Sequence, residues 1–134
     1  MHALVTGGAG FIGSHLSRRL LSRGVRVTII DNLCTGLAEN VPPDANFIKC
    51  DISADNWTAT IPEDVDVVFH LAAQSSGEIS FEDPIYDLRA NTLGTLALLK
   101  WSLDHGVKKV VFTSSMNVYG DVADEPIGEE CHVN

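Results

Sequence analysis

Glycines spaced to approach a phosphate follow the first apolar run of the chain. Residues 5–13, "VTGGAGFIG", match G-x-G-x-x-G through Gly8, Gly10 and Gly13, and G-x-x-G-x-x-G through Gly7, Gly10 and Gly13. Glycines permit a tight turn and close backbone approach, so the following helix can direct free amides and its positive dipole end at a pyrophosphate. The pattern predicts a dinucleotide-binding loop, and the alternative is an ordinary glycine-rich turn.

An acidic residue stands at the distance that such a loop requires. Asp31 ends an apolar run eighteen residues after Gly13. An aspartate there can accept charge-assisted hydrogen bonds from both hydroxyls of an adenosine ribose, whereas a 2′-phosphate would bring negative charge against it. No arginine follows Asp31 to receive such a phosphate, so the sequence predicts NAD in preference to NADP. The alternative for Asp31 is a solvated residue at a strand end.

The elements that must position these residues alternate along the chain. The expected strands are residues 2–7, 25–31, 47–51, 66–73 and 107–115, and the expected helices are residues 11–24 and 84–104. Alternation of this kind implies parallel strands joined by right-handed crossovers. The sequence therefore predicts an α/β fold, a Rossmann-type doubly wound parallel sheet with strand order 3-2-1-4-5.

The second expected helix has a clear start and a repeating apolar pattern. Asp83 and Pro84 are an N-cap and first-turn pair, and Gly106 would follow the end of the helix. Apolar or weakly polar residues recur inside it at close to 3.6 residues, namely Ile85, Leu88, Thr92, Leu96, Leu99 and Leu103.

Composition limits the classes of function. At 134 residues the chain is expected to be one domain, residues 1–134, and its formal charge of −9 gives little support for a nucleic-acid surface. No apolar run approaches the roughly 20 residues that span a bilayer, and the start resembles no signal peptide. Cys34, Cys50 and Cys131 form no CxxC pair, so we expect no metal site and a cytoplasmic location. The acidic residues 121–134 are expected to form a solvated loop.

Six short motifs in order give the chain a family resemblance. "TGGAGFIG", "DNLCTG", "CDI", "HLAAQ", "ANTLGT" and "SSMNVYG" resemble the N-terminal portion of the extended short-chain dehydrogenase/reductases. Among these, the chain is most similar to the NAD-dependent sugar-nucleotide epimerase/dehydratase family, and above all to its UDP-glucose 4-epimerase-like members. The resemblance runs from residue 3 to about residue 130.

The resemblance implies a role in NAD binding for residues in each motif. Backbone amides of Phe11 and Ile12 would bind the pyrophosphate over Gly7, Gly10 and Gly13. The rest of the implied cofactor site is Asp31, Asn32, Thr35 and Gly36 around the ribose, Asp51 and Ile52 beside the adenine, Leu71, Ala72 and Ala73 along the channel, and Asn91 behind the active site. The two alanines could instead be packing residues, and Asn91 could face solvent or bond its own helix. His70 is expected to be a hydrogen-bonded core histidine.

The catalytic residues implied by the resemblance are only partly present. The hydroxyl aligned with Ser115 would hydrogen-bond the sugar oxygen that a tyrosine deprotonates, with a lysine four residues after that tyrosine. A phenol of pKa about 10 is a poor base at neutral pH unless a nearby positive charge stabilises its phenolate. Tyr119 is followed at that spacing by Ala123, and Tyr86 by Ala90. Tyr119 is therefore predicted to pack rather than react.

The stretch before Tyr119 also distinguishes between related activities. The resemblance implies an acid pair at the positions of Met116 and Asn117 in sugar-nucleotide 4,6-dehydratases, and a glutamate at the position of Asn117 in UDP-glucuronate decarboxylases. The epimerase-like activity is favoured, with hydride removal at sugar C4, rotation of a 4-keto intermediate and hydride return. The alternatives are a dehydratase or decarboxylase relative, or a complete, non-catalytic NAD-binding module.

The resemblance also implies that a larger protein continues beyond this chain. In relatives the following segment supplies the tyrosine and lysine, a sixth strand and a substrate-binding domain. We therefore expect the NAD-binding part of an epimerase, inactive alone, with an open edge on the fifth strand. The implied partners are a nucleotide sugar, most simply a UDP-sugar, and a second copy that pairs through the helix 84–104.

Overall fold

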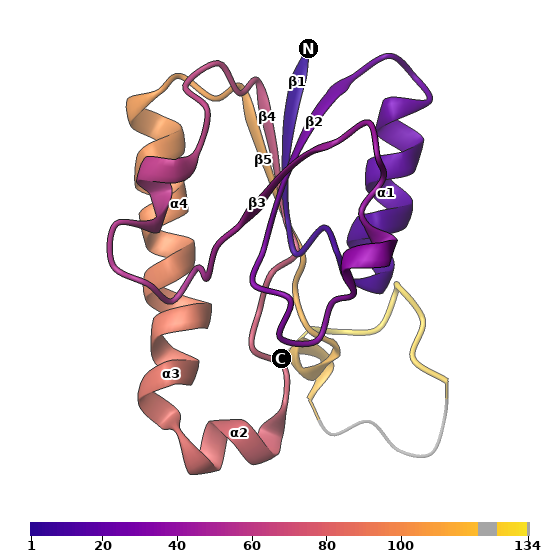
Figure 1. Cartoon of the computed structure of the whole chain (residues 1–134). Coiled ribbons are helices and arrows are strands. Elements are labelled where there is room, and N and C mark those ends of the chain that lie inside the picture. The colour runs from indigo at the N-terminus through magenta and orange to yellow at the C-terminus, as the bar shows by residue number, and fades with distance from the viewer. Residues whose placement is uncertain (121–125, 134) are drawn as a thin grey trace.

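The computed structural model contains a parallel five-stranded sheet with helices on both faces, and it describes residues 1–120 and 126–133 (Figure 1). The strands are β1 (His2–Thr6), β2 (Arg26–Asp31), β3 (Asn46–Lys49), β4 (Val67–His70) and β5 (Lys109–Phe112), and the helices are α1 (Phe11–Leu21), α2 (Gly77–Glu82), α3 (Pro84–Leu88) and α4 (Gly94–Asp104). The strand order is β3-β2-β1-β4-β5, as predicted. Each neighbouring pair is parallel.

The alternating side chains of the central strands form two cores, one on each face of the sheet. On one face Leu4, Ile30 and Val68 pack with Leu98 and Trp101 of α4. On the other face the core contains Ala3, Val5, Val25, Val27 and Ile29, with Leu20 and Leu21 of α1 packed against it. β1 is buried along its whole length, which explains the apolar run from Ala3 to Val5 at its centre.

The strand register aligns the carboxyl ends of the central strands. Thr6 of β1 pairs with Ile30 of β2 on one side and with His70 of β4 on the other, and His70 pairs with Phe112 of β5. The glycine loop, Asp31, the segment after β4 and the serines after β5 therefore begin at one edge of the sheet. Ligands of doubly wound sheets bind at this edge.

The helix expected over residues 84–104 is α3 and α4 joined by a π turn (Arg89–Leu93). The Asp83 carboxylate accepts from the backbone N of Tyr86 at 2.9 Å, which confirms the predicted cap. The turn is followed at once by Gly94, where a Cβ would lie 2.7 Å from the carbonyl oxygen of Ile52. A glycine is needed there because the helix passes so close to the chain after β3.

The predicted apolar repeat of this helix faces away from the sheet. Its five aliphatic members are exposed, at 62% for Ile85, 48% for Leu88, 60% for Leu96, 45% for Leu99 and 82% for Leu103. The buried residues of the same segment are Ala90, Gly94, Leu98, Trp101 and Ser102. The helix therefore has two apolar faces. The face with Ala90, Leu98 and Trp101 is buried, and the face with the predicted repeat is exposed.

Several predicted boundaries were too wide. The strand expected over residues 66–73 ends at His70, where the neighbouring β1 also ends. The amide of Leu71 donates to both the carbonyl and the hydroxyl of Thr6, and the amide of Ala72 donates to the same hydroxyl, each at 3.2 Å. α2 was not predicted, and β5 is an exposed edge strand, as expected. Residues 126–133 of the expected acidic loop contain no helix or strand, and residues 121–125 and 134 lie outside the described part.

Candidate dinucleotide-binding site

The glycine loop packs backbone against backbone at the end of β4. Gly7 has φ +72°, and a Cβ there would lie 2.7 Å from the backbone N of Ala72. A Cβ on Gly13 would lie 2.2 Å from the carbonyl oxygen of Gly7. Side chains are excluded at both positions, so the loop lies directly on the sheet edge and leaves a cradle in front of α1.

The first turn of α1 offers unpaired backbone donors beside this loop. The N-cap is Gly10, which has no side chain to cap the helix. The first amides of an α-helix have no acceptor within the helix, and here they belong to Phe11 and Ile12, whose side chains are exposed. Amides at a helix N-terminus bind phosphate well.

Asp31 connects the end of β2 to the glycine loop. Its carboxylate accepts from the backbone N of Ala9 at 3.0 Å and from the backbone N of Leu33 at 2.8 Å. The residue is only 8% exposed, so the alternative of a solvated strand end is wrong. Each carboxylate oxygen has one backbone donor, which leaves lone pairs for further donors such as ribose hydroxyls.

Asn32 and Asp51 join the loops that follow β2 and β3. The Asn32 amide donates to the Asp51 carboxylate at 2.9 Å, and the backbone N of Ser53 donates to the same carboxylate at 2.8 Å. Burial by itself would raise the pKa of Asp51, but these hydrogen bonds from Asn32 and Ser53 outweigh it and lower the pKa. Asp51 is thus held as a carboxylate at the wall of the site.

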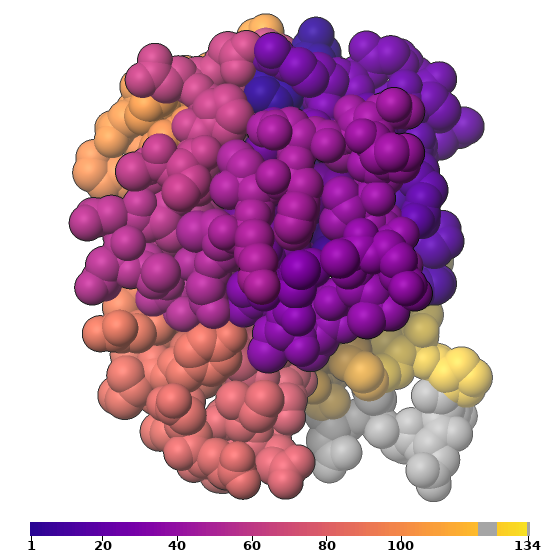
Figure 2. All heavy atoms as spheres, viewed as in Figure 1, coloured from indigo at the N-terminus to yellow at the C-terminus, as the bar shows by residue number. Residues whose placement is uncertain are grey.

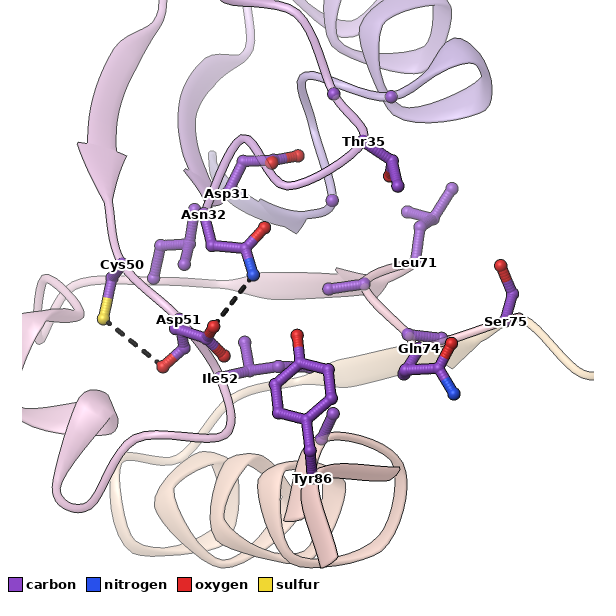
Figure 3. Close-up of a pocket in the computed structure, with 17 residues that line it drawn as sticks. Asp31, Asn32, Thr35, Cys50, Asp51, Ile52, Leu71, Gln74, Ser75 and Tyr86 are labelled. Carbon is purple, nitrogen blue, oxygen red and sulfur yellow. Dashed lines mark hydrogen bonds between the residues drawn. The ribbon is translucent and has the colours of Figure 1, made fainter. Parts of the chain in front are cut away.

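Tyr86 enters the site from the first turn of α3. Its ring rises into the cavity with the hydroxyl directed to the side where Asn32 and Asp51 lie (Figure 3). Burial raises the pKa of this hydroxyl, and the negative charge of Asp51 raises it further. The phenol therefore stays protonated and can donate a hydrogen bond.

These residues surround a cavity of about 230 Å³. It is lined by Gly7, Gly10, Ile30, Asp31, Asn32, Thr35, Gly36, Cys50, Asp51, Ile52, Leu71, Ala72, Ala73, Gln74, Ser75, Tyr86 and Ala90. The α2–α3 segment projects past the end of the sheet (Figure 1). In the space-filling view, atoms of this part of the chain and of the loop after β2 lie at the same end of the molecule (Figure 2). No lysine or arginine is among the described residues that line it, so the donors for an anion here are backbone amides and neutral side chains.

A second cavity of about 650 Å³ lies next to the first. The two cavities share the segment from Leu71 to Ser75. The second is also lined by Ile12, Ser76, Gly77, Ser80, Asp87, Asn91, Thr95, Phe112, Thr113, Ser114, Ser115 and Asn117. The Ser115 hydroxyl accepts from the backbone N of Asn117 at 3.2 Å, which leaves its proton free to be donated.

Asn91 does more than either alternative for it suggested. Its side-chain oxygen accepts from the backbone N of Gln74 at 2.9 Å, and its amide donates to the carbonyl of Gln74 at 2.8 Å. The π turn thus presents Asn91 to the segment after β4, where it pairs with the backbone much as a neighbouring strand would. Its amide also donates to the Asp87 carboxylate one turn earlier at 3.1 Å, so its partners are the Gln74 backbone and a side chain of its own helix.

His70 is the buried core histidine that was expected. Its Nδ1 lies 2.6 Å from the Thr6 hydroxyl and its Nε2 lies 2.9 Å from the Thr95 hydroxyl, and the residue is 2% exposed. Because the Thr6 oxygen already accepts from two amides, its proton is directed to Nδ1, so Nε2 carries the proton of the ring. Burial lowers the pKa of His70 to about 4.

Most of the predicted site residues meet at these two cavities. Gly7, Gly10, Asp31, Asn32, Thr35, Gly36, Asp51 and Ile52 line the first, Ile12, Asn91 and Ser115 line the second, and Leu71, Ala72 and Ala73 line both. Phe11 and Gly13 line neither of them. Phe11 offers its amide from the first turn of α1, while Gly13 packs under the loop.

Sequence reasoning missed several lining residues, chiefly Tyr86, Gln74 and Ser75. A signal existed for Tyr86, since it lies one helical turn before the small residue Ala90 at the start of a predicted helix. Gln74 and Ser75 follow the fourth strand directly and so belong at the carboxyl edge. Neither argument identifies the direction of the side chain.

The described residues contain neither a metal-binding cluster nor a membrane-spanning helix. No cluster of three or more histidine, cysteine or acidic side chains is placed to bind a metal within residues 1–120 and 126–133. No helix in that part of the chain is long and apolar enough to cross a membrane.

The sheet order, the glycine loop and the acid at the end of β2 together define a Rossmann-type dinucleotide-binding domain. The chain belongs to the NAD dependent epimerase/dehydratase family, whose profile matches residues 3–134.

Known relatives are similar over the whole of this chain. A putative UDP-glucose 4-epimerase of Methanocaldococcus jannaschii is 42% identical over 133 residues, 98% of this chain and 44% of the relative. The crystal structure of Thermus thermophilus UDP-glucose 4-epimerase in complex with NAD is 41% identical with a TM-score of 0.82, covering 100% of this chain and 44% of that one. UDP-glucuronic acid decarboxylase 1 of Xenopus tropicalis is 36% identical over 133 residues, 98% of this chain and 31% of the relative. The chain thus spans less than half the length of each.

Proposed function

We propose that this chain is the NAD-binding part of a UDP-glucose 4-epimerase-like enzyme. The observation that carries the proposal is the shared wall from Leu71 to Ser75, which places the cavity of the glycine loop beside the cavity of Ser115. A cavity of about 230 Å³ is below the roughly 300–1,000 Å³ of typical ligand pockets. A dinucleotide with its adenosine in the first cavity would therefore extend along this wall into the second.

The residues of the first cavity fit an NAD molecule. The Phe11 and Ile12 amides would bind the pyrophosphate beside Gly7 and Gly10, above the close packing that Gly13 permits. The remaining proposed contacts are Asp31, Asn32, Thr35 and Gly36 with the adenosine ribose, Asp51 and Ile52 with the adenine, and Leu71, Ala72 and Ala73 with the channel. Asn91 would support this channel from behind through Gln74.

Ser115 is the proposed catalytic residue of this chain. Its free proton can be donated to the sugar oxygen at C4, the position at which bound NAD would accept and return a hydride. The chain contains no tyrosine followed four residues later by lysine, so it has no activated phenol to act as base. We therefore propose that these 134 residues alone do not epimerise a nucleotide sugar.

A UDP-sugar is the proposed substrate, because each of the three relatives named above has a UDP-sugar in its name. The decarboxylase relative makes decarboxylation the second candidate. Asn117 argues against it, since its side chain cannot transfer a proton as a carboxylate does. A stand-alone NAD-binding module without chemistry is the remaining alternative.

We also propose a homodimer and a cytoplasmic enzyme. The exposed aliphatic residues on α3 and α4 would pair with the same face of a second copy. The three free cysteines fit a reducing compartment.

The proposal is tested by calorimetric titration and by activity. The purified chain should bind one NAD⁺, and NADP⁺ at least tenfold more weakly because its 2′-phosphate would face Asp31. The full-length protein should interconvert UDP-glucose and UDP-galactose, and Ser115→Ala should lower kcat by about 10²-fold. Failure to bind NAD⁺ would contradict the cofactor assignment, and turnover by the purified chain that Ser115→Ala abolishes would contradict its proposed inactivity.

A further inference from the structure

One carboxylate oxygen gathers three donors at the wall between the two cavities. The Oδ1 of Asp87 accepts from the Gln74 amide at 2.6 Å, from the Ser80 hydroxyl at 2.7 Å and from the Asn91 amide at 3.1 Å. The donors come from the segment after β4, from α2 and from the π turn. Asp87 thus joins three successive segments of the chain between residues 74 and 91.

The segment from Gln74 to Ser76 is held by the residues that Asp87 orients. The Gln74 side chain accepts from the backbone N of Ser76 at 2.6 Å and donates to its carbonyl at 3.0 Å. The Asn91 side chain holds the backbone N and carbonyl of Gln74. Asp87 bonds both of these side chains, and hydrogen bonds to an ionised acceptor are shorter and stronger than neutral ones.

We propose that Asp87 is a positioning residue that sets the conformation of the Gln74–Ser76 wall and with it the passage from the first cavity to the second. The inference rests on the proposed function, since it assumes that a dinucleotide crosses this wall. Asp87 is absent from the lining of the first cavity. Loss of the Asp87 side chain should therefore weaken binding of the part of the ligand that crosses the wall and leave binding of the adenosine end unchanged.

The test compares a whole ligand with its adenosine half on the purified chain. In Asp87→Ala we expect the affinity for AMP to change by less than twofold and the affinity for NAD⁺ to fall about tenfold. In Asp87→Asn the side-chain oxygen can still accept, so the loss for NAD⁺ should be about threefold. Glu82→Ala removes an exposed acidic side chain from the same segment and should change neither affinity. Equal losses for AMP and NAD⁺, or no loss for either, would overturn the proposal.

Hydrogen exchange measures how firmly the Gln74–Ser76 wall is held when no ligand is present. The backbone amides of Gln74 and Ser76 should exchange at least tenfold faster in Asp87→Ala than in the wild type, because both are bonded to side chains that Asp87 holds. Ser80→Ala, which removes one donor and leaves Asp87, should accelerate them less and serves if Asp87→Ala does not fold. Unchanged exchange in both variants contradicts the proposal. If the wild type binds neither AMP nor NAD⁺, the proposed function fails while this measurement still decides whether Asp87 holds the wall.

Discussion

The carboxylate of Asp31 accepts a hydrogen bond from the backbone N of Ala9 at 3.0 Å, across twenty-two residues of sequence. The acid that is proposed to bind the ribose therefore also holds the loop that is proposed to bind the pyrophosphate. The two signals that predicted a dinucleotide site are parts of one structure.

Replacing this acid should affect stability and binding together. Asp31→Ala leaves the amides of Ala9 and Leu33 without acceptors, so we expect a loss of about 1–3 kcal/mol in the free energy of unfolding and no measurable NAD⁺ binding. Urea unfolding and calorimetric titration measure the two effects. Asp44→Ala, at an exposed position, is the control and should behave as wild type. NAD⁺ affinity that survives in Asp31→Ala would show that the ribose is bound elsewhere.

The glycine loop should tolerate a methyl group according to the space at each position. A Cβ on Gly13 would lie 2.2 Å from the carbonyl oxygen of Gly7, whereas one on Gly10 would lie 3.3 Å from it. We expect Gly13→Ala to abolish NAD⁺ binding and lower thermal stability, and Gly10→Ala to have a smaller effect. Gly77→Ala, with nothing within 4 Å of the added Cβ, is the matched control for thermal unfolding. A Gly13→Ala protein that melts and binds NAD⁺ as the wild type does would contradict the packing described for the loop.

Tyr86 should contribute to the adenosine end of the site. If its ring packs on the bound base, Tyr86→Ala should weaken AMP and NAD⁺ equally, by about 1–3 kcal/mol of binding free energy, as for other base–aromatic contacts. Tyr86→Phe keeps the ring and should lose less than Tyr86→Ala. Competition titrations with AMP measure these losses of binding free energy. Two variants with wild-type affinity for AMP would exclude Tyr86 from the site.

The stability of the fold should depend on pH through His70. Its pKa is lowered from 6.5 to about 4 in the fold, so the unfolded chain binds the proton more readily between these values. The contribution of His70 to the free energy of unfolding is fully present above pH 6.5. It is lost as the pH falls toward 4, by roughly 3 kcal/mol in total. Three carboxyls have pKa values lowered below 3.8, and their stabilising contribution is lost only at more acidic pH: Asp51, Asp64 and Asp66.

Urea unfolding at pH 7, 6, 5 and 4.5 measures this slope. His70→Gln, which keeps a polar side chain between Thr6 and Thr95, should be less stable at pH 7 and should lose the slope between pH 6.5 and 4. The exposed His132 offers the control substitution His132→Gln, which should keep it. An unchanged slope in His70→Gln would mean that the proton is taken up by another group.

The exposed face of α3 and α4 should decide association. Leu96 is 60% exposed on this face, and Leu96→Glu would place a charge in the proposed interface between two copies. Sedimentation of the full-length protein should show a dimer that this substitution converts to a monomer. Asp44→Ala, at an exposed position outside α3 and α4, should leave the dimer intact. A wild-type protein that stays monomeric at micromolar concentration would contradict the dimer.

Local patterns were enough to predict the frame of this protein. The glycine spacing, Asp31 at the end of the second strand and the alternation of strands with helices predicted the sheet order and the cofactor edge. The Asp83 and Pro84 pair likewise predicted where α3 begins. Each of these features depends on residues that are close together in the chain. Such local patterns can be read directly from the sequence.

Only the tertiary structure decided which side chains meet. Periodicity identified an apolar repeat on the helix from residue 84, but a repeat does not show whether the sheet covers it. In the structure the other face of the helix packs on the sheet. Asn91 pairs with Gln74 from the π turn, Tyr86 is directed into the cavity, and Asp87 has three donors. Contacts of this kind join residues whose separation is set by packing, so their geometry exists only once the helix lies on the sheet.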